Sequence, residues 1–290
     1  MTEAVIGRPR AQSPHPPMSL VELAPSHKRG LTLRGPVLNA SGTLGFAVEA
    51  EGVVDFDGLG GFVTNPVTFE SRGPASAPNA AAVVGGIVLH TGLPNPGIKA
   101  AVRRFAPDWE RVFGRRGLPV IVHLAATRPQ DVRRAVEILE RVDVVSGLEL
   151  GLRDNISASE MTQVVHAARG NLPLIVRLPL DRAERYAPTA VRAGADALCI
   201  GAPPRWHPTG PDSARLPRSG RLYAPGTRDP MLAALALVAG LGLEVPLIAA
   251  GGILTASDVT TALNAGAVAV QADLALWRGR SLPGPGDLGP

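Results

Sequence analysis

Eight short apolar runs, separated by stretches with helical spacing, constrain the fold of this chain more than any other feature of its sequence. Each run is nearly continuous in apolar residues, which is typical of strands buried on both faces of a parallel sheet. We expect strands over residues 37–41, 61–65, 119–125, 147–151, 173–178, 197–202, 246–252 and 267–273. Helical spacing predicts helices over residues 130–141, 157–169, 182–192, 229–241 and 256–264.

Strands that alternate with helices favour an α/β fold, and eight such units predict a (β/α)8 TIM barrel in a single domain over residues 18–278. An open doubly wound sheet is the alternative, but no Gly-x-Gly-x-x-Gly motif follows a strand. Ser157 and Glu160 form a capping-box pattern, and Thr255 or Ser257 is placed to cap the last helix. The Pro-rich residues 1–17 and the Gly/Pro-rich residues 279–290 are predicted to be flexible tails.

Two connections between the expected strands are too long for simple turns. Residues 66–96 follow the second strand, and residues 203–225 follow the sixth. Both leave from the carboxyl ends of strands, where barrel enzymes build their sites, so both are expected to be lids or binding loops. The second connection is rich in proline and arginine, which predicts a mobile, solvated cover without regular helix.

Composition excludes several classes of protein. Hydrophobic residues make up 45% of the 290 residues, so the chain can bury a sizeable core. No apolar run reaches the roughly 18 residues of a membrane span, and residues 1–17 lack the apolar core of a signal peptide, which together predict a cytoplasmic protein without membrane contact. The net charge of +4 comes from scattered arginines, and 4% aromatic residues are too few for base stacking, so no nucleic-acid partner is expected. The single cysteine, Cys199, excludes a disulfide framework and is predicted to be a buried core thiol.

Small residues near two strand ends are candidates for ligand contact. Gly251 and Gly252 close the seventh strand just before a helix, where exposed backbone N–H groups bind phosphate in barrels, although a tight turn also calls for glycine. The segment 39–43, Asn-Ala-Ser-Gly-Thr, ends the first strand with small side chains that suit the underside of a flat ring, or a simple turn.

Two histidines are candidates for acid–base chemistry. His90 and His123 lie near the expected catalytic face, and Asp154 is placed to orient one of them as a general base, although unused surface or packed histidines fit the pattern as well. Glu149 lies within a strand, either inside the barrel or in an ordinary ion pair. We expect no metal site, because the spacing of these residues does not establish that they converge.

The chain resembles the class 1 dihydroorotate dehydrogenases over roughly residues 30–277. The residues that carry the resemblance are the segments 36–45, 61–68, 72–74, 92–97, 176–178, 194–198, 220–225, 251–253 and 265–271, which follow one another in the family's order. The resemblance implies an FMN-binding barrel that oxidises dihydroorotate to orotate in pyrimidine biosynthesis and passes a hydride to the flavin. It also implies a homodimer that binds a small-molecule substrate.

The positions that hold flavin in the family are partly kept. The resemblance assigns cofactor contacts to the matching residues Ala40, Ser41, Gly42, Arg177, Gly251 and Gly252. Arg177 replaces a lysine and keeps the positive charge that favours reduced, anionic flavin. The family's Gly-Thr after the eighth strand is Asp273-Leu274 here, and a carboxylate beside a phosphate opposes binding. Tyr223 stands at a small serine, and Arg221 stands at a glycine, where it is a candidate to offset Asp273 or to contact an anion.

The positions that recognise dihydroorotate are changed together. Asn65 stands at the family's catalytic lysine and Asp154 at its cysteine base. Of the four substrate asparagines, three become Leu89, Gly151 and Ala202, and the fourth is matched only out of register by Asn155. Sites built from directed hydrogen bonds discriminate strongly, so the loss of this polar ring predicts that orotate recognition is abolished. We nevertheless keep Asp154, Asn65, His90 and His123 as the candidate catalytic residues.

Three functions remain open on this reading. The first is a diverged FMN-linked oxidoreductase acting on CH–CH bonds of another substrate. The second is a catalytically inactive paralogue, a pseudoenzyme that serves as a scaffold or ligand-binding barrel. The third is a barrel enzyme without flavin that uses His and Asp. A flavin absorption spectrum would separate the first from the other two.

Overall fold

The computed structural model describes residues 19–77, 79–83, 85–201, 203–207 and 219–278. The predicted tails over residues 1–17 and 279–290 lie outside the described residues, as do Ala202 and the middle of the 203–225 connection.

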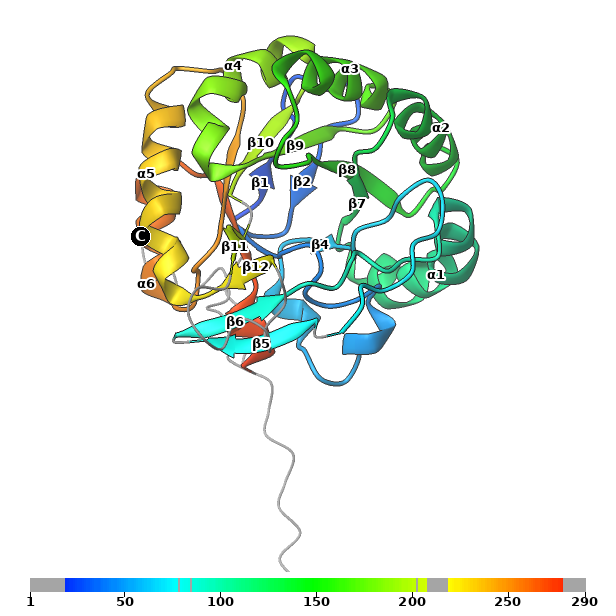
Figure 1. Ribbon diagram of the computed structural model, residues 1–290. Coiled ribbons are helices and arrows are strands. Elements are labelled where there is room, and N and C mark those ends of the chain that lie inside the picture. The colour runs from blue at the N-terminus through cyan, green and yellow to red at the C-terminus, as the bar shows by residue number, and fades with distance from the viewer. Residues whose placement is uncertain (1–18, 78, 84, 202, 208–218, 279–290) are drawn as a thin grey trace, which may run out of the picture.

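Eight parallel strands form the central sheet, and every strand predicted from the apolar runs is confirmed (Figure 1). Their order around the sheet is β3, β14, β13, β10, β9, β8, β7 and β4. Their bounds are β3 Val37–Asn39, β4 Phe62–Val63, β7 Val120–Ala125, β8 Val145–Gly151, β9 Leu174–Leu178, β10 Ala197–Ile200, β13 Leu247–Ala250 and β14 Ala269–Ala272.

The first and last strands of this order meet, so the sheet is a barrel and the open-sheet alternative is wrong. A parallel bridge pairs Leu38 with Gly61, and Gly60 N–H donates to the Val37 carbonyl over 2.7 Å. The buried Asn39 side chain reinforces the junction, because its amide accepts from Val63 N–H (2.8 Å) and donates to the Val63 carbonyl (2.6 Å). β4 is short, and the Asn39 side chain supplies hydrogen bonds between β3 and β4 in place of backbone pairs.

Helices surround the barrel, and the five predicted helices are confirmed with small changes at their ends. Their bounds are α2 Pro129–Leu139, α3 Ala158–Ala168, α4 Ala183–Ala193, α5 Arg228–Ala239 and α6 Ala256–Asn264. Ser157 and Thr255 both cap through a capping box, with Glu160 and Asp258 as partners. Two further helices are α1 Ile98–Phe113 and α7 Leu274–Trp277. In the described part of the chain, none of the helices combines the length and the apolar character needed to span a membrane.

An N-terminal hairpin closes the amino end of the barrel. Strands β1 (Val21–Glu22) and β2 (Thr32–Leu33) pair antiparallel, and Leu31 and Leu33 pack against the first residues of the barrel strands. Gly147 leaves room for this plug, because a Cβ there would lie 2.9 Å from the Leu31 side chain. Cys199 is fully buried in the same apolar cluster, and burial raises the pKa of its thiol, which confirms that it is a core residue.

The two long connections pair with each other over the carboxyl-terminal side of the barrel. Residues 66–96 contribute β5 (Ala80–Val83) and β6 (Gly86–Leu89), while β11 (Arg205–Trp206) and β12 (Gly220–Tyr223) come from residues 203–225. They form one antiparallel sheet in the order β11-β12-β6-β5, called the outer sheet below (Figure 1). Residues 205–206 and 220–223 of the predicted cover are strands and not helix, and Arg221 to Tyr223 pair with Ile87 to Leu89. The mobility of this connection stays a prediction.

Candidate active site

Four polar side chains, three from the adjacent strands β7, β8 and β9 and one from β14, meet inside the carboxyl-terminal half of the barrel. His123 (β7) and Glu149 (β8) are directly paired in register, and His123 Nδ1 lies 2.7 Å from Glu149 Oε1. Arg177 (β9) donates from Nη1 to Glu149 Oε1 (3.3 Å) and to Gln271 Oε1 (2.8 Å). Gln271 (β14) donates in turn to Glu149 Oε2. We call these four residues the interior network.

The interior network fixes the charge of Glu149 and the tautomer of His123. Glu149 has no exposed surface, and burial alone would raise its pKa. The hydrogen bond from His123 and the charge of Arg177 outweigh burial and lower the pKa of Glu149 to about 2. An ionised carboxylate only accepts hydrogen bonds, so the proton of a neutral His123 ring lies on Nδ1, and Nε2 is left as the acceptor.

Gly151 makes room for the His123 ring. A Cβ at Gly151 would lie 2.3 Å from His123 Nε2 and 2.8 Å from Cε1. Contacts this short do not occur between real atoms, so no side chain fits at position 151 while His123 keeps its place. The placement of the His123 ring therefore requires glycine at position 151.

Unpartnered polar atoms lie beside the ends of the first two barrel strands. Among the described residues, Ser41 Oγ, Thr43 Oγ1 and Asn65 Oδ1 are buried and have no hydrogen-bond partner. Buried polar atoms without partners are rare, and each calls for an explanation such as a bound molecule. Ser41 and Asn65 were predicted at ligand positions, and Ala40 and Gly42 flank Ser41 in the same turn.

The ends of β13 and β14 are packed against the chain itself. A Cβ at Gly252 would lie 2.4 Å from Arg228 N, so this glycine allows its loop to approach the start of α5. Asp273 is 4% exposed and accepts the N–H of Leu274 at the beginning of α7. Burial raises the pKa of Asp273, only partly offset by that hydrogen bond and by the Arg177 charge.

Arg221 does not offset Asp273, which corrects that expectation. Its guanidinium donates to Asp154 Oδ1 (2.6 Å) and to the Pro203 carbonyl (3.1 Å) instead. Tyr223, two residues further along β12, stacks obliquely on Trp277 with ring centroids 5.0 Å apart. The Tyr223 ring thus packs on the chain beside Asp273, and burial followed by the Asp273 charge raises the pKa of its hydroxyl.

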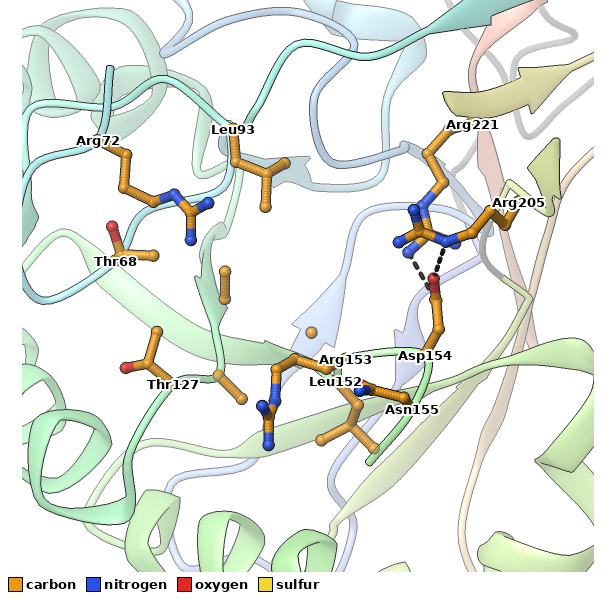
Figure 2. A pocket seen from close by; sticks show the side chains of 13 residues that line it. Thr68, Arg72, Leu93, Thr127, Leu152, Arg153, Asp154, Asn155, Arg205 and Arg221 are labelled. Carbon is orange, nitrogen blue, oxygen red and sulfur yellow. Dashed lines mark hydrogen bonds and ion pairs between the residues drawn. The ribbon is translucent and has the colours of Figure 1, made fainter. Parts of the chain in front are cut away.

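A cavity of about 510 Å³ opens where the loops after β4, β7 and β8 face the outer sheet. Figure 2 shows Arg72 reaching into it from one side and Arg205 and Arg221 from the opposite side. Asp154 stands between the last two, with Arg205 Nε 2.7 Å from Oδ2 and Arg221 Nη2 2.6 Å from Oδ1 (Figure 2). Backbone and side chains of residues 125–127 and 151–153 form the remaining wall.

The structure brings some of the predicted site residues together and separates others. Glu149, not Asp154, orients His123, so the predicted Asp–His pair is wrong. His90 follows β6 in the outer sheet, and its described contact is a backbone hydrogen bond to Asn79. Within the described residues, no three His, Cys, Asp or Glu side chains gather as a metal site.

Sequence reasoning missed Gln271 as a member of the site and left Glu149 undecided. The available signal was one large polar side chain inside each of several otherwise apolar strands. His123, Glu149, Arg177 and Gln271 each interrupt a buried run, and in a barrel alternate residues face the interior.

Fold and site together define a (β/α)8 barrel with its polar site at the carboxyl ends of the strands, and comparisons identify its family. The family profile described as Dihydroorotate dehydrogenase matches residues 25–179. The Dihydroorotate dehydrogenase B (NAD(+)) catalytic subunit of Desulforudis audaxviator is 32% identical over 266 residues, covering 83% of this chain and 82% of that protein. The protein of the same name from Pelobacter propionicus is 31% identical over 261 residues, covering 83% and 84%. This chain belongs to the dihydroorotate dehydrogenase family.

A solved structure shares the fold. The crystal structure of DHODH from Eimeria tenella in complex with ferulenol superposes with a TM-score of 0.73 over 93% of this chain and 82% of that chain. Sequence identity in this comparison is 17%, so the likeness concerns the barrel and not the residues of the site.

Proposed function

We propose that this chain is an FMN-linked oxidoreductase of the dihydroorotate dehydrogenase family that acts on a substrate other than dihydroorotate. The observation that carries the proposal is the interior network, which holds a buried carboxylate, a cation and a histidine at the ends of four strands. Perturbed charged groups in a buried cluster at the catalytic end of a barrel are typical of an active site.

The barrel mouth fits the ring of a flavin. Ser41 and Asn65 carry buried polar atoms that lack partners among the described residues, and the buried Arg177 supplies a positive charge nearby in the barrel. The small residues Ala40 and Gly42 fit the role that the family resemblance gives them beneath the ring. These residues would hold FMN, which would supply the hydride acceptor for oxidation of the substrate.

His123 is the side chain best arranged to take the accompanying proton. Glu149 accepts the Nδ1 proton and thereby leaves Nε2 as a base. Glu149 also stabilises the imidazolium that forms when Nε2 takes a proton, because it stays ionised. Asp154 is less suited as a base, because Arg221 and Arg205 overcome the effect of burial and lower the pKa of its carboxyl.

Dihydroorotate does not suit this site. At the family's lysine position Asn65 carries no charge, and at one asparagine position Gly151 leaves its space to His123. Unmatched polar groups reduce catalytic efficiency by orders of magnitude. We expect the purified protein to show no turnover of dihydroorotate with common acceptors, measured by orotate absorbance; robust orotate formation would show that the substrate assignment is wrong.

The phosphate end of the flavin site is weakened. Asp273 takes the N–H of Leu274 with its own carboxylate and adds negative charge where the family resemblance places the phosphate. We expect weak FMN binding by the wild type, with a flavin spectrum at about 370 and 450 nm after addition of FMN. Asp273→Asn keeps an acceptor for Leu274 and removes the charge, so FMN affinity should rise about tenfold.

A matched control variant distinguishes the effect of the Asp273 charge on FMN affinity from the effect of any change in net charge. Asp57→Asn removes the same charge from an exposed aspartate that pairs with Arg116, away from the ends of β13 and β14, and should leave FMN affinity unchanged. If neither the wild type nor Asp273→Asn binds FMN at any concentration tested, the oxidoreductase proposal fails, and an inactive, ligand-binding barrel or an enzyme without flavin takes its place. The homodimer implied by the resemblance is part of the proposal, and light scattering on the purified protein tests it.

A further inference from the structure

The cavity shown in Figure 2 is strongly positive. Four arginines line it, and Asp154 is the single acid among its described lining residues. Arg153 is already paired with Glu160 over 3.0 Å, so the remaining formal charges, from Arg72, Arg205, Arg221 and Asp154, sum to +2. Arginine stays protonated at every physiological pH and offers five N–H donors in a planar fork that matches carboxylate and phosphate groups. Charge of this density inside one concave site favours a ligand with more than one negative charge.

Asp154 neutralises only part of this charge. Its two carboxylate oxygens are taken separately by Arg205 and Arg221, and its carboxyl pKa is held below the ordinary value by these arginines despite burial. Arg205 also contacts Ser219 Oγ (3.4 Å), and Arg221 contacts the Pro203 carbonyl. Each guanidinium therefore has further N–H donors without a partner among the described residues. Asp154 ties the loop after β8 to the outer sheet and holds both arginines in place.

Arg72 is the cation on the opposite wall. Its backbone is fixed by hydrogen bonds in both directions with Asn95 (2.9 and 3.0 Å). Its side chain points into the cavity (Figure 2) and, within the described part of the chain, has no hydrogen bond or ion pair. The backbone of Arg72 is thus fixed, and its guanidinium points into the cavity without a counter-ion among the described residues. This arrangement suits the binding of an anionic ligand.

A strained residue lies beside Arg72. Leu93 lines the cavity in the left-handed region, with φ of 56°, although it is not glycine, and 41% of its surface is exposed. Backbone strain in a non-glycine residue gathers at ligand sites, where the surrounding structure over-determines it. Together with Ala125, Ala126 and Leu152, it gives the middle of the cavity an apolar lining.

We propose that this cavity binds a small organic molecule with two acidic groups, one held by Arg72 and the other by Arg205 and Arg221. The carbon skeleton between the two groups lies on the apolar middle of the cavity. A dicarboxylate and a phosphorylated carboxylate share this chemistry. The claim that this ligand is the substrate rests on the oxidoreductase function proposed above. The claim that the cavity binds such a ligand does not depend on that function. Dihydroorotate carries a single carboxylate, so the second cationic wall marks a different substrate class.

Calorimetric titration of the full chain at low ionic strength tests the proposal. The probes are succinate, glutarate and 3-phosphoglycerate as ligands with two acidic groups, and propionate and inorganic phosphate as ligands with one. At least one two-group probe should bind ten-fold or more tightly than both one-group probes. Tighter binding of 3-phosphoglycerate identifies a phosphorylated ligand, and tighter binding of succinate or glutarate identifies a dicarboxylate. Equal affinities across all five probes would overturn the proposal.

Substitutions locate the site. Arg72→Gln should weaken two-group probes at least ten-fold and leave one-group probes nearly unchanged, while Arg72→Lys should restore part of the affinity. Arg115→Gln is the matched control, since Arg115 precedes β7 at the other end of the barrel and is exposed. An effect of Arg115→Gln equal to that of Arg72→Gln would contradict the assignment.

Titration of the same samples with FMN separates the two proposals. Two-group binding by a protein that binds no added FMN, either as wild type or as Asp273→Asn, upholds this inference and refutes the oxidoreductase function. FMN binding without any preference for two-group probes refutes this inference and leaves the oxidoreductase function standing.

Discussion

Gly151→Ala tests the central claim about the site, that the His123 ring occupies the space of a side chain at position 151. The added Cβ would lie 2.3 Å from His123 Nε2, more than 1 Å inside ordinary contact distance of about 3.4 Å or more, so the ring must move. Overpacking of this kind costs about 1–3 kcal/mol. Moving the ring also strains its 2.7 Å hydrogen bond to the buried Glu149, which places the expected loss at the upper end of that range.

A double-mutant cycle with His123→Ala isolates the contact. In the His123→Ala background the space beside residue 151 is open, so Gly151→Ala should change stability by less than about 0.5 kcal/mol. The assay is urea unfolding at neutral pH, followed by circular dichroism. Gly226→Ala is the control, because a Cβ at Gly226 has no heavy atom within 4 Å and should be tolerated. A neutral Gly151→Ala in the wild type, or an equal loss in both backgrounds, would refute the placement of His123.

Two further predictions concern buried ionisable groups. The pKa of Glu149 is lowered from 4.5 to about 2, so its contribution to stability is complete above pH 4.5 and is lost as pH falls towards 2; the stability difference between wild type and Glu149→Gln should shrink over that interval in urea titrations. Cys199 is fully buried with a raised thiol pKa, so a thiol reagent should fail to modify the native protein at neutral pH and should react once urea unfolds it; rapid labelling of the folded protein would contradict the packing of the barrel interior.

The barrel was predictable from sequence because its strands are nearly uninterrupted apolar runs. A run such as 173–178 is buried on both faces, and the single arginine within it does not break the pattern. Helix α1 was not among the predicted helices, and Pro107 lies inside it. The outer sheet was missed because its pairing joins Leu89 to Arg221, residues far apart in the chain, and strands of two to four residues carry little periodicity of their own.

The site was predictable residue by residue but not pair by pair. Family resemblance and residue type singled out His123, Arg177 and Asp154. Their partners depend on the register between strands, which places His123 opposite Glu149, and on the outer sheet, which brings Arg205 and Arg221 to Asp154. Local sequence determines neither the register between strands nor the pairing of strands far apart in the chain. For this reason the expected Asp–His pair was wrong, although both residues had been singled out.

The pairing of β6 with β12 has a consequence for how this pocket can be re-engineered. The strand that carries Arg221 is hydrogen-bonded to a hairpin that lies more than a hundred residues earlier in the chain. A loop graft from a relative at residues 80–89 alone would leave β12 facing a foreign edge and would displace the arginines of β11 and β12. The two segments therefore determine the pocket jointly. Chimeras between homologues should keep an intact pocket only when residues 80–89 and 203–225 are exchanged at the same time.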